Sequence, residues 1–225
     1  MTLTATHETT EQGIMADVAQ PSRTLVGRDA ELTEIASLLG ARSSAEPTEG
    51  GAAGRSHVVL AGDAGVGKTR LLMELRDLAL ADGWRVVAGH CLDFGDSALP
   101  YLPFSEVLGR LEAELPDLVA KVTYEHPALS RLLPGRRVMT ADSARVDPAA
   151  ETEKTDRADL FTAVHALLET AAEQAPLLLV IEDCHWADQS TRDLLSFLFS
   201  RPFEGPVAVV AVSYTHLTLP TILRV

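Results

Sequence analysis

A lysine and a threonine stand together at the end of a short glycine-rich segment, and both side chains can bind phosphate or a metal ion. The pattern is glycine, four residues, glycine, lysine, and serine or threonine, and its members are Gly62, Asp63, Ala64, Gly65, Val66, Gly67, Lys68 and Thr69. The glycines let the backbone curl so that successive N–H groups point at a phosphate. We expect Lys68 to reach the β- and γ-phosphates and Thr69 to bind Mg²⁺. The pattern predicts a P-loop that binds ATP or ADP, with Arg70 among its nucleotide contacts.

The residues on either side of this loop predict the elements that would hold it. HVVLA at 57–61 is a short, apolar, β-branched run typical of a buried strand. After the loop, leucines recur at helical spacing as far as Gly83, and WRVVAG at 84–89 predicts a second, parallel strand. The order of strand, loop and helix weighs against the alternative, a glycine-rich turn with an incidental lysine.

Two adjacent carboxylates, Glu182 and Asp183, end the apolar run PLLLVIED at 176–183. A P-loop needs acids at the end of a neighbouring strand to hold the metal ion and to act on water. We expect Glu182 to bind Mg²⁺ and Asp183 to orient or deprotonate the attacking water. The alternative is that the pair caps the helix that follows. Trp186 is expected to pack beneath that helix rather than to cover the site.

Composition limits the classes of partner. The formal net charge is -13 at pH 7, and the only lysines are Lys68, Lys121 and Lys154. Such a chain is not expected to bind nucleic acid, because affinity for a phosphate backbone comes from clustered Lys and Arg. There is no apolar run of membrane-spanning length and no signal peptide, so we predict a cytoplasmic location without membrane contact. The two cysteines, Cys91 and Cys184, are assigned no chemistry.

Periodicity divides the rest of the chain. We predict a disordered leader at 1–24 and one domain at 25–212, with a flexible connector at 41–56 and a loop at 134–156. Apolar spacing also predicts a strand at 206–212 and four helices, at 29–40, at 104–115, from 157, and within 186–200. Alternating strands and helices predict an α/β fold, a P-loop NTPase three-layer sandwich with a mostly parallel sheet.

Several segments resemble those of the STAND-type P-loop ATPases, in particular the ATPase module of large LuxR-type transcriptional regulators, which is related to AAA-like origin-recognition ATPases. The segments are LVGRDAEL (25–32), AGDAGVGKTRLL (61–72), GHCLDFGDSALPYLPFSEVL (89–108) and APLLLVIEDCHWADQSTRDLLSFL (175–198). The resemblance implies that Val26, Gly27 and Arg28 lie near the adenine and phosphates. It also implies a switch that ADP holds closed, that ATP opens and that slow hydrolysis resets, and it raises ATP-dependent self-association as a partner prediction.

The end of the chain departs from this family. The family usually has a Tyr-Arg pair after the last apolar run, whereas Thr215 follows Tyr214 here. VSYTHLTLPT at 212–221 resembles a translated sequencing-library adaptor, so we expect 213–225 to be a non-native tail. The domain is then expected to be C-terminally incomplete, with the P-loop strand exposed at a sheet edge and the chain poorly soluble. Any DNA-binding output would lie in a missing C-terminal domain.

Three other interpretations remain open. The same module could belong to a cyclase- or kinase-linked signalling protein, and nothing in 225 residues separates these outputs. A small-molecule kinase shares the P-loop, although the VGR and EDCHWAD segments count against it. The last is a truncated chimera that neither folds nor binds a ligand.

Overall fold

The computed structural model describes residues 33, 35, 57–63, 65–93, 95, 99–133, 150–214 and 222–224. Thr33 and Ile35 are helical, within the helix predicted at 29–40. The expected leader at 1–24 and connector at 41–56 lie outside the described residues. Among the helices that are described, none is both long enough and apolar enough to cross a membrane.

Five parallel strands form one sheet in the order β2-β3-β4-β1-β5. The strands are β1 (His57–Ala61), β2 (Arg85–His90), β3 (Leu177–Glu182), β4 (Val207–Ser213) and β5 (Ile222–Arg224). The first four confirm the predicted strands, with every end within one residue of the prediction. β1 and β2 are parallel, as predicted, but β4 and β3 lie between them. In register, His57 of β1 stands opposite Val209 of β4, and Arg85 of β2 opposite Leu177 of β3.

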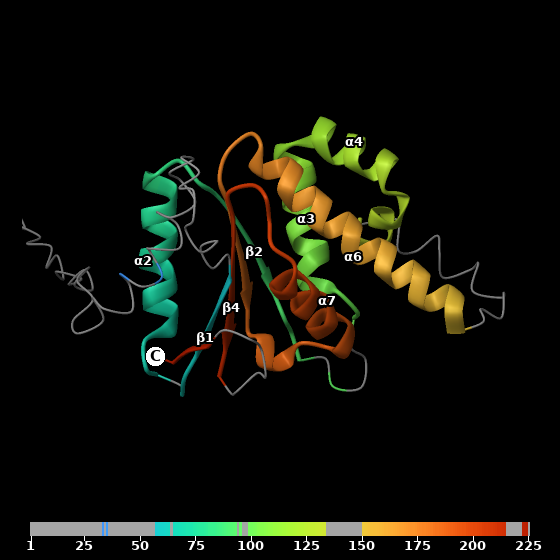
Figure 1. Ribbon diagram of the computed structural model, residues 1–225. Helices are drawn as coiled ribbons and strands as arrows, with labels where there is room; N and C mark the ends of the chain where they lie inside the picture. Colours follow the sequence, from blue (N-terminus) through green and yellow to red (C-terminus); the bar gives the residue numbers. More distant parts are fainter. Residues whose placement is uncertain are drawn as a thin grey trace, which may run out of the picture.

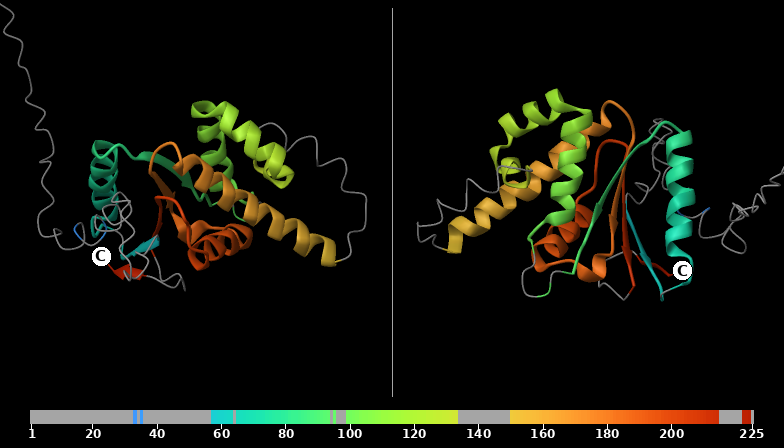
Figure 2. Two further views of the ribbon diagram at one scale, coloured as in Figure 1. Left: turned by 45° about the horizontal axis from the view of Figure 1, so that its top comes forward. Right: turned by 180° about the vertical axis from the view of Figure 1, so that it is seen from behind.

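Helices cover the sheet on both faces and make three layers. Helix α2 (Lys68–Ala81) lies on one face, and α3 (Leu102–Glu114), α6 (Ala150–Ala172) and α7 (Gln189–Ser200) lie on the other (Figures 1 and 2). α4 (Pro116–Glu125) and the 3-10 helix η2 (Pro127–Leu132) follow α3 in the chain and pack against α6. A short 3-10 helix, η3 (Cys184–Trp186), follows β3. The prediction of an α/β sandwich with a mostly parallel sheet is confirmed.

Successive side chains of the strands pack alternately into two separate hydrophobic cores, one on each face of the sheet. Leu177, Leu179 and Ile181 pack with α3, α6 and α7, whereas Leu178 and Val180 pack with α2. Because successive side chains of a strand point to opposite faces, a strand covered on both faces must be apolar throughout. This is why β3 and β4 read as continuous apolar runs without alternation. The parallel pairing of all five strands places their carboxyl ends at one edge of the sheet.

The prediction of a loop at 134–156 is wrong at its C-terminal end, because α6 begins at Ala150. The segment AETEKTD at 150–156 has few large apolar residues, which is why its periodicity predicted a solvated loop. Ala, Glu and Lys nevertheless have high helix propensity, which favours a helix in this segment. Figure 1 shows these first turns projecting beyond α7. The remainder of the predicted loop, 134–149, lies outside the described residues.

The expectation of an exposed P-loop strand is also wrong. β1 pairs with β4 on one side and with β5 on the other, where Leu60 stands opposite Leu223. The pairing partner comes from within the segment predicted to be a non-native tail. A strand needs only backbone N–H and C=O groups in register to occupy a sheet edge, so family sequence is not required for the pairing.

Candidate nucleotide-binding site

The loop between β1 and α2 is shaped by two glycines in the left-handed region. Gly65 has φ 81° and Gly67 has φ 96°, conformations that residues with a Cβ rarely adopt. Gly67 is the N-cap of α2, and no side chain among the described residues caps the helix there. The first turn also lacks an acidic residue. The N-terminal end of α2 therefore presents backbone N–H groups and a positive helix dipole to an anion.

Lys68, the first residue of α2, has its ammonium group inside the curl of the loop. Its Nζ donates hydrogen bonds to the carbonyl oxygens of Gly62 at 2.6 Å and Asp63 at 2.8 Å, and the residue is 6% exposed. Burial lowers the pKa of Lys68, while the carboxylates of Asp63 and Asp183 act in the opposite direction. The ring of Tyr214 also lies 4.2 Å from Nζ. A bound phosphate would replace these contacts as the partner of the Lys68 ammonium.

The two residues after Lys68 have different environments. Thr69 is exposed in the first turn of α2, directly after Lys68. Arg70 forms an ion pair with Glu74 one turn further along the helix, at 3.2 Å. Ala64, Val26, Gly27 and Arg28 lie outside the described residues. Their predicted roles as nucleotide contacts stay predictions.

Glu182 and Asp183 lie at the same edge of the sheet as the P-loop, because all strands are parallel and their carboxyl ends meet there. Glu182 is the last residue of β3, and Asp183 follows with φ 54°, in the left-handed region. Asp183 is close enough for its charge to favour the ammonium form of Lys68. The tertiary structure thus brings Lys68 within electrostatic range of an anion 115 positions later in the sequence.

His90 and Glu106 belong to this edge, although they were not among the predicted site residues. His90 is the last residue of β2 and stands opposite Glu182 in register. Its Nε2 lies 3.7 Å from Oε1 of Glu182, and its Nδ1 lies 3.0 Å from Oε2 of Glu106 in α3. The backbone N–H of His90 also donates to Glu106, at 2.9 Å. The imidazole therefore joins Glu182 to α3. Only the pairing of β2 with β3 reveals this contact.

The alternative role for the acidic pair, capping the following helix, is wrong. The cap of α7 is Asp188, whose Oδ1 accepts hydrogen bonds from the N–H groups of Ser190 at 2.8 Å and Thr191 at 3.1 Å. The Thr191 hydroxyl donates to the other oxygen of the same carboxylate. Asp183 makes no side-chain cap bond within the described residues. Its carboxylate is thus left for other chemistry.

Trp186 does not pack beneath α7 as predicted. It is 49% exposed, and its ring stacks at a tilt on that of His185 with centroids 4.9 Å apart. The 3-10 turn η3 carries Trp186 outward, whereas Cys184 in the same turn is buried. The apolar residues of α7 that do face the core are Leu194, Leu195, Leu198 and Phe199.

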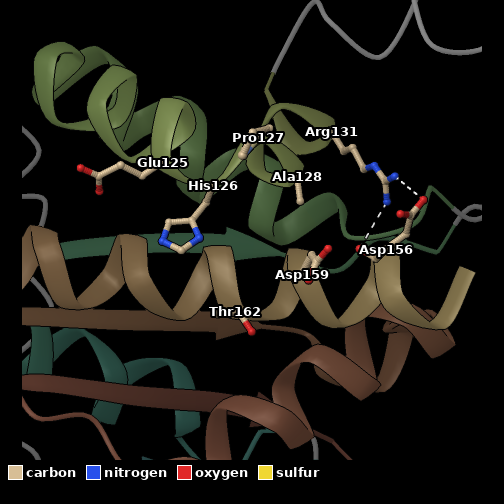
Figure 3. A pocket seen from close by; sticks show the side chains of 8 residues that line it. All are labelled: Glu125, His126, Pro127, Ala128, Arg131, Asp156, Asp159 and Thr162. Carbon is tan, nitrogen blue, oxygen red and sulfur yellow. Dashed lines mark hydrogen bonds and ion pairs between the residues drawn. The ribbon is translucent and has the colours of Figure 1, made fainter. Parts of the chain in front are cut away.

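A separate pocket of about 530 Å³ lies between α4, η2 and α6 (Figure 3). Glu125, His126, Asp159 and an ion pair line part of it, and in that pair Arg131 donates to Asp156 at 2.6 Å. It contains neither the glycine loop nor the acidic pair at the strand ends. The pocket is distinct from the candidate nucleotide site.

Sequence and structure comparisons relate this chain to known proteins. The model of the AAA ATPase domain family matches residues 24–210. The chain is 31% identical over 204 residues to an uncharacterized protein of Rhizobium meliloti (strain 1021), and the match covers 84% of the chain but 18% of that relative. One similar solved structure is Cdc6p from Pyrobaculum aerophilum, with a TM-score of 0.42 and 16% identity; the match covers 89% of this chain and 42% of that chain. Another is PCH-2 from C. elegans, with a TM-score of 0.41 and 14% identity; the match covers 87% of this chain and 42% of that chain.

The family match extends over most of the chain, from ahead of the P-loop to the middle of β4. It includes both the glycine loop and the acidic pair at the end of β3. The chain therefore belongs to the AAA ATPase domain family, whose members bind nucleotide.

Proposed function

We propose that this domain binds ATP with Mg²⁺ at the P-loop and hydrolyses it slowly. The observation that carries the proposal is the meeting of Lys68 and Asp183 at one edge of the sheet, each positioned by a turn with positive φ. Lys68 and the α2 N-terminus would bind the β- and γ-phosphates. Thr69 and Glu182 would hold Mg²⁺, and Asp183 would act on the attacking water. Arg70, Val26, Gly27 and Arg28 complete the proposed nucleotide contacts.

The bound metal ion would neutralise charge on the transferred phosphate. The chain's own residues supply the rest. Hydrogen bonds to the carbonyl oxygens of Gly62 and Asp63 would hold the Lys68 ammonium at the loop before nucleotide binds. On binding, the ammonium would leave these oxygens to contact a phosphate. His90 restrains Glu182 and connects it to α3, which gives the acid a defined place relative to the loop.

We further propose that the domain is a cytoplasmic switch module of a signal-transducing transcriptional regulator of the STAND and LuxR type. The resemblance of the segments at 25–32, 89–108 and 175–198 supports this assignment. The Rhizobium meliloti relative, of which the match covers 18%, is consistent with a module inside a much longer protein. ADP would favour one state and ATP another, with ATP-dependent self-association, and any DNA contact would come from a separate domain.

Nucleotide binding is tested by titrating a fluorescent ATP analogue with Mg²⁺. Lys68→Ala removes charge-assisted hydrogen bonds that contribute about 1.5–3 kcal/mol, so the affinity is expected to fall about 10- to 100-fold. Lys121→Ala, at an exposed position of α4, is the matched control for loss of a lysine and should bind normally. Equal affinities of wild type and Lys68→Ala would refute the P-loop assignment.

The switch is tested separately, by hydrogen exchange of the protein saturated with ADP and with a non-hydrolysable ATP analogue. Differences in protection at α7 and around η3 are expected, because these follow the acidic pair directly. Identical exchange in the two states would leave a nucleotide-binding domain without a switch. Transfer of the γ-phosphate to a small-molecule acceptor would instead support a kinase.

A further inference from the structure

An aromatic ring from the end of β4 lies against the ammonium of Lys68. Tyr214 directly follows Ser213, the last residue of β4, and β4 is the neighbour of the P-loop strand β1 in the sheet. The Nζ of Lys68 lies over the Tyr214 ring, 4.2 Å from its centroid, a distance at which the electrons of the ring attract a cation. Tyr214 is in the predicted non-native tail, yet its ring contacts residues of the domain.

The same ring also touches the turn that follows Asp183. The imidazole of His185, in η3, lies edge to face with Tyr214, with centroids 4.7 Å apart and the ring planes at 82°. On its other contact, His185 stacks at a tilt on Trp186, with centroids 4.9 Å apart. The Nδ1 of His185 is buried and has no hydrogen-bond partner among the described residues. A continuous line of contacts therefore runs from Lys68 through Tyr214 and His185 to Trp186.

The ring and a phosphate would use the same group of Lys68. An ammonium has three N–H groups, and the carbonyl oxygens of Gly62 and Asp63 accept hydrogen bonds from this one. A phosphate oxygen carries negative charge and makes a charge-assisted hydrogen bond, which is stronger than the attraction of a neutral ring. Tyr214 is 42% exposed, so its side chain has space to move toward solvent.

We propose that Tyr214 is a positioning residue, which competes with the nucleotide phosphates for Lys68 and passes the loss of that contact through His185 to Trp186. The proposal rests on the proposed function, because it names what binds Lys68 before nucleotide does. Asp183 is the N-cap of η3, the turn that holds His185 and Trp186. Release of Tyr214 from Lys68 therefore reaches the turn that carries the acid.

The competition is tested by titrating a fluorescent ATP analogue with Mg²⁺ into wild type, Tyr214→Leu and Tyr214→Phe. Leucine removes a contact of the free protein only, so its affinity is expected to rise about 2- to 5-fold, as the loss of a cation–π contact predicts. Phenylalanine keeps the ring and should bind like wild type. Tyr214→Met repeats the comparison if leucine disturbs folding.

Two results would overturn the competition. The first is binding by Tyr214→Leu and Tyr214→Met that is equal to or weaker than that of wild type. The second is a Tyr214→Phe variant that binds as the leucine variant does, because the effect would then belong to the hydroxyl group and not to the ring.

The path to Trp186 is tested by tryptophan fluorescence of the full chain. The chain has two tryptophans, so Trp84→Phe leaves Trp186 as the only one. In that background Mg-ATP should change the emission intensity, Tyr214→Phe should keep the change, and Tyr214→Leu should abolish it. If Trp84→Phe disturbs folding, loss of the wild-type response in Trp186→Phe gives the same assignment. An undiminished response in Tyr214→Leu would overturn the path.

A comparison without nucleotide separates this proposal from the proposed function. The emission of Trp186 should already differ between wild type and Tyr214→Leu, because His185 loses its edge contact, whereas Tyr214→Phe should match wild type. Equal emission from all three proteins would overturn the link between Tyr214 and Trp186. If wild type binds no nucleotide, the proposed function is refuted, and this comparison still decides whether the aromatic contacts connect the two residues.

Discussion

Gly89 lies directly against the backbone of Pro103. A Cβ built at position 89 would fall 2.2 Å from the carbonyl oxygen of Pro103 and 2.7 Å from its carbonyl carbon. Gly89 is in β2 and Pro103 is in the first turn of α3, so the absence of a side chain allows helix and strand to approach closely. The same approach places Glu106 of α3 beside His90, and through it beside Glu182.

Gly89→Ala is expected to destabilise the domain by about 1–3 kcal/mol or more, because backbone atoms cannot move aside as a side chain can. Thermal unfolding should show a decrease of several degrees in Tm, at about 2–4 °C per kcal/mol for a chain of this size. Gly205→Ala is the matched control, since its Cβ would meet the Cβ of Ala172 at an ordinary 3.6 Å. Equal melting temperatures for the two variants would contradict the close approach.

Glu182→Gln and Asp183→Asn should differ in what they impair. Glu182→Gln is expected to weaken Mg²⁺-dependent binding of ATP, because a neutral amide replaces a metal ligand. Asp183→Asn is expected to bind Mg-ATP but to hydrolyse it about 10²- to 10⁴-fold more slowly, the usual range for loss of a general base. Parallel binding titrations and phosphate-release assays measure both. The same defect in both variants would contradict the separate roles.

Asp188→Ala removes the N-cap of α7, and with it the hydrogen bonds from Ser190, Thr191 and the Thr191 hydroxyl. The expected loss of stability is about 0.5–2 kcal/mol. Asp188→Asn keeps an oxygen that can accept from the N–H groups and should lose much less. Denaturant unfolding of the three proteins tests this order. A Tm or midpoint for Asp188→Ala equal to that of wild type would show that α7 does not depend on the cap.

Deletion of residues 215–225 removes β5 and leaves one side of β1 unpaired. An apolar parallel strand with unpaired N–H and C=O groups is a site for association with another chain. The truncated chain is expected to scatter more light than the full chain at equal concentration and to elute earlier from a size-exclusion column. Identical elution as monomers would show that β5 does not protect this edge. The poor solubility predicted for the full chain is a separate prediction.

Local pattern accounted for much of the fold. The runs at 57–61, 176–183 and 206–212 predicted β1, β3 and β4, because strands covered on both faces leave a continuous apolar run in the sequence. The sequence pattern places the start of α6 too late, because most residues from Ala150 to Asp156 are polar and lack apolar periodicity. The prediction that Trp186 is buried is also wrong. A large aromatic side chain favours burial, but the 3-10 turn η3 directs Trp186 toward solvent.

By itself the sequence determined the kind of chemistry, because the glycine loop needs particular residues at fixed spacing and Glu182 and Asp183 end an apolar strand. Only the tertiary structure decided which distant residues meet. The strand order brings His90 beside Glu182 and pairs β1 with Ile222–Arg224. The physical reason is that strand pairing depends on backbone groups common to all residues, so the order of strands leaves little trace in local sequence.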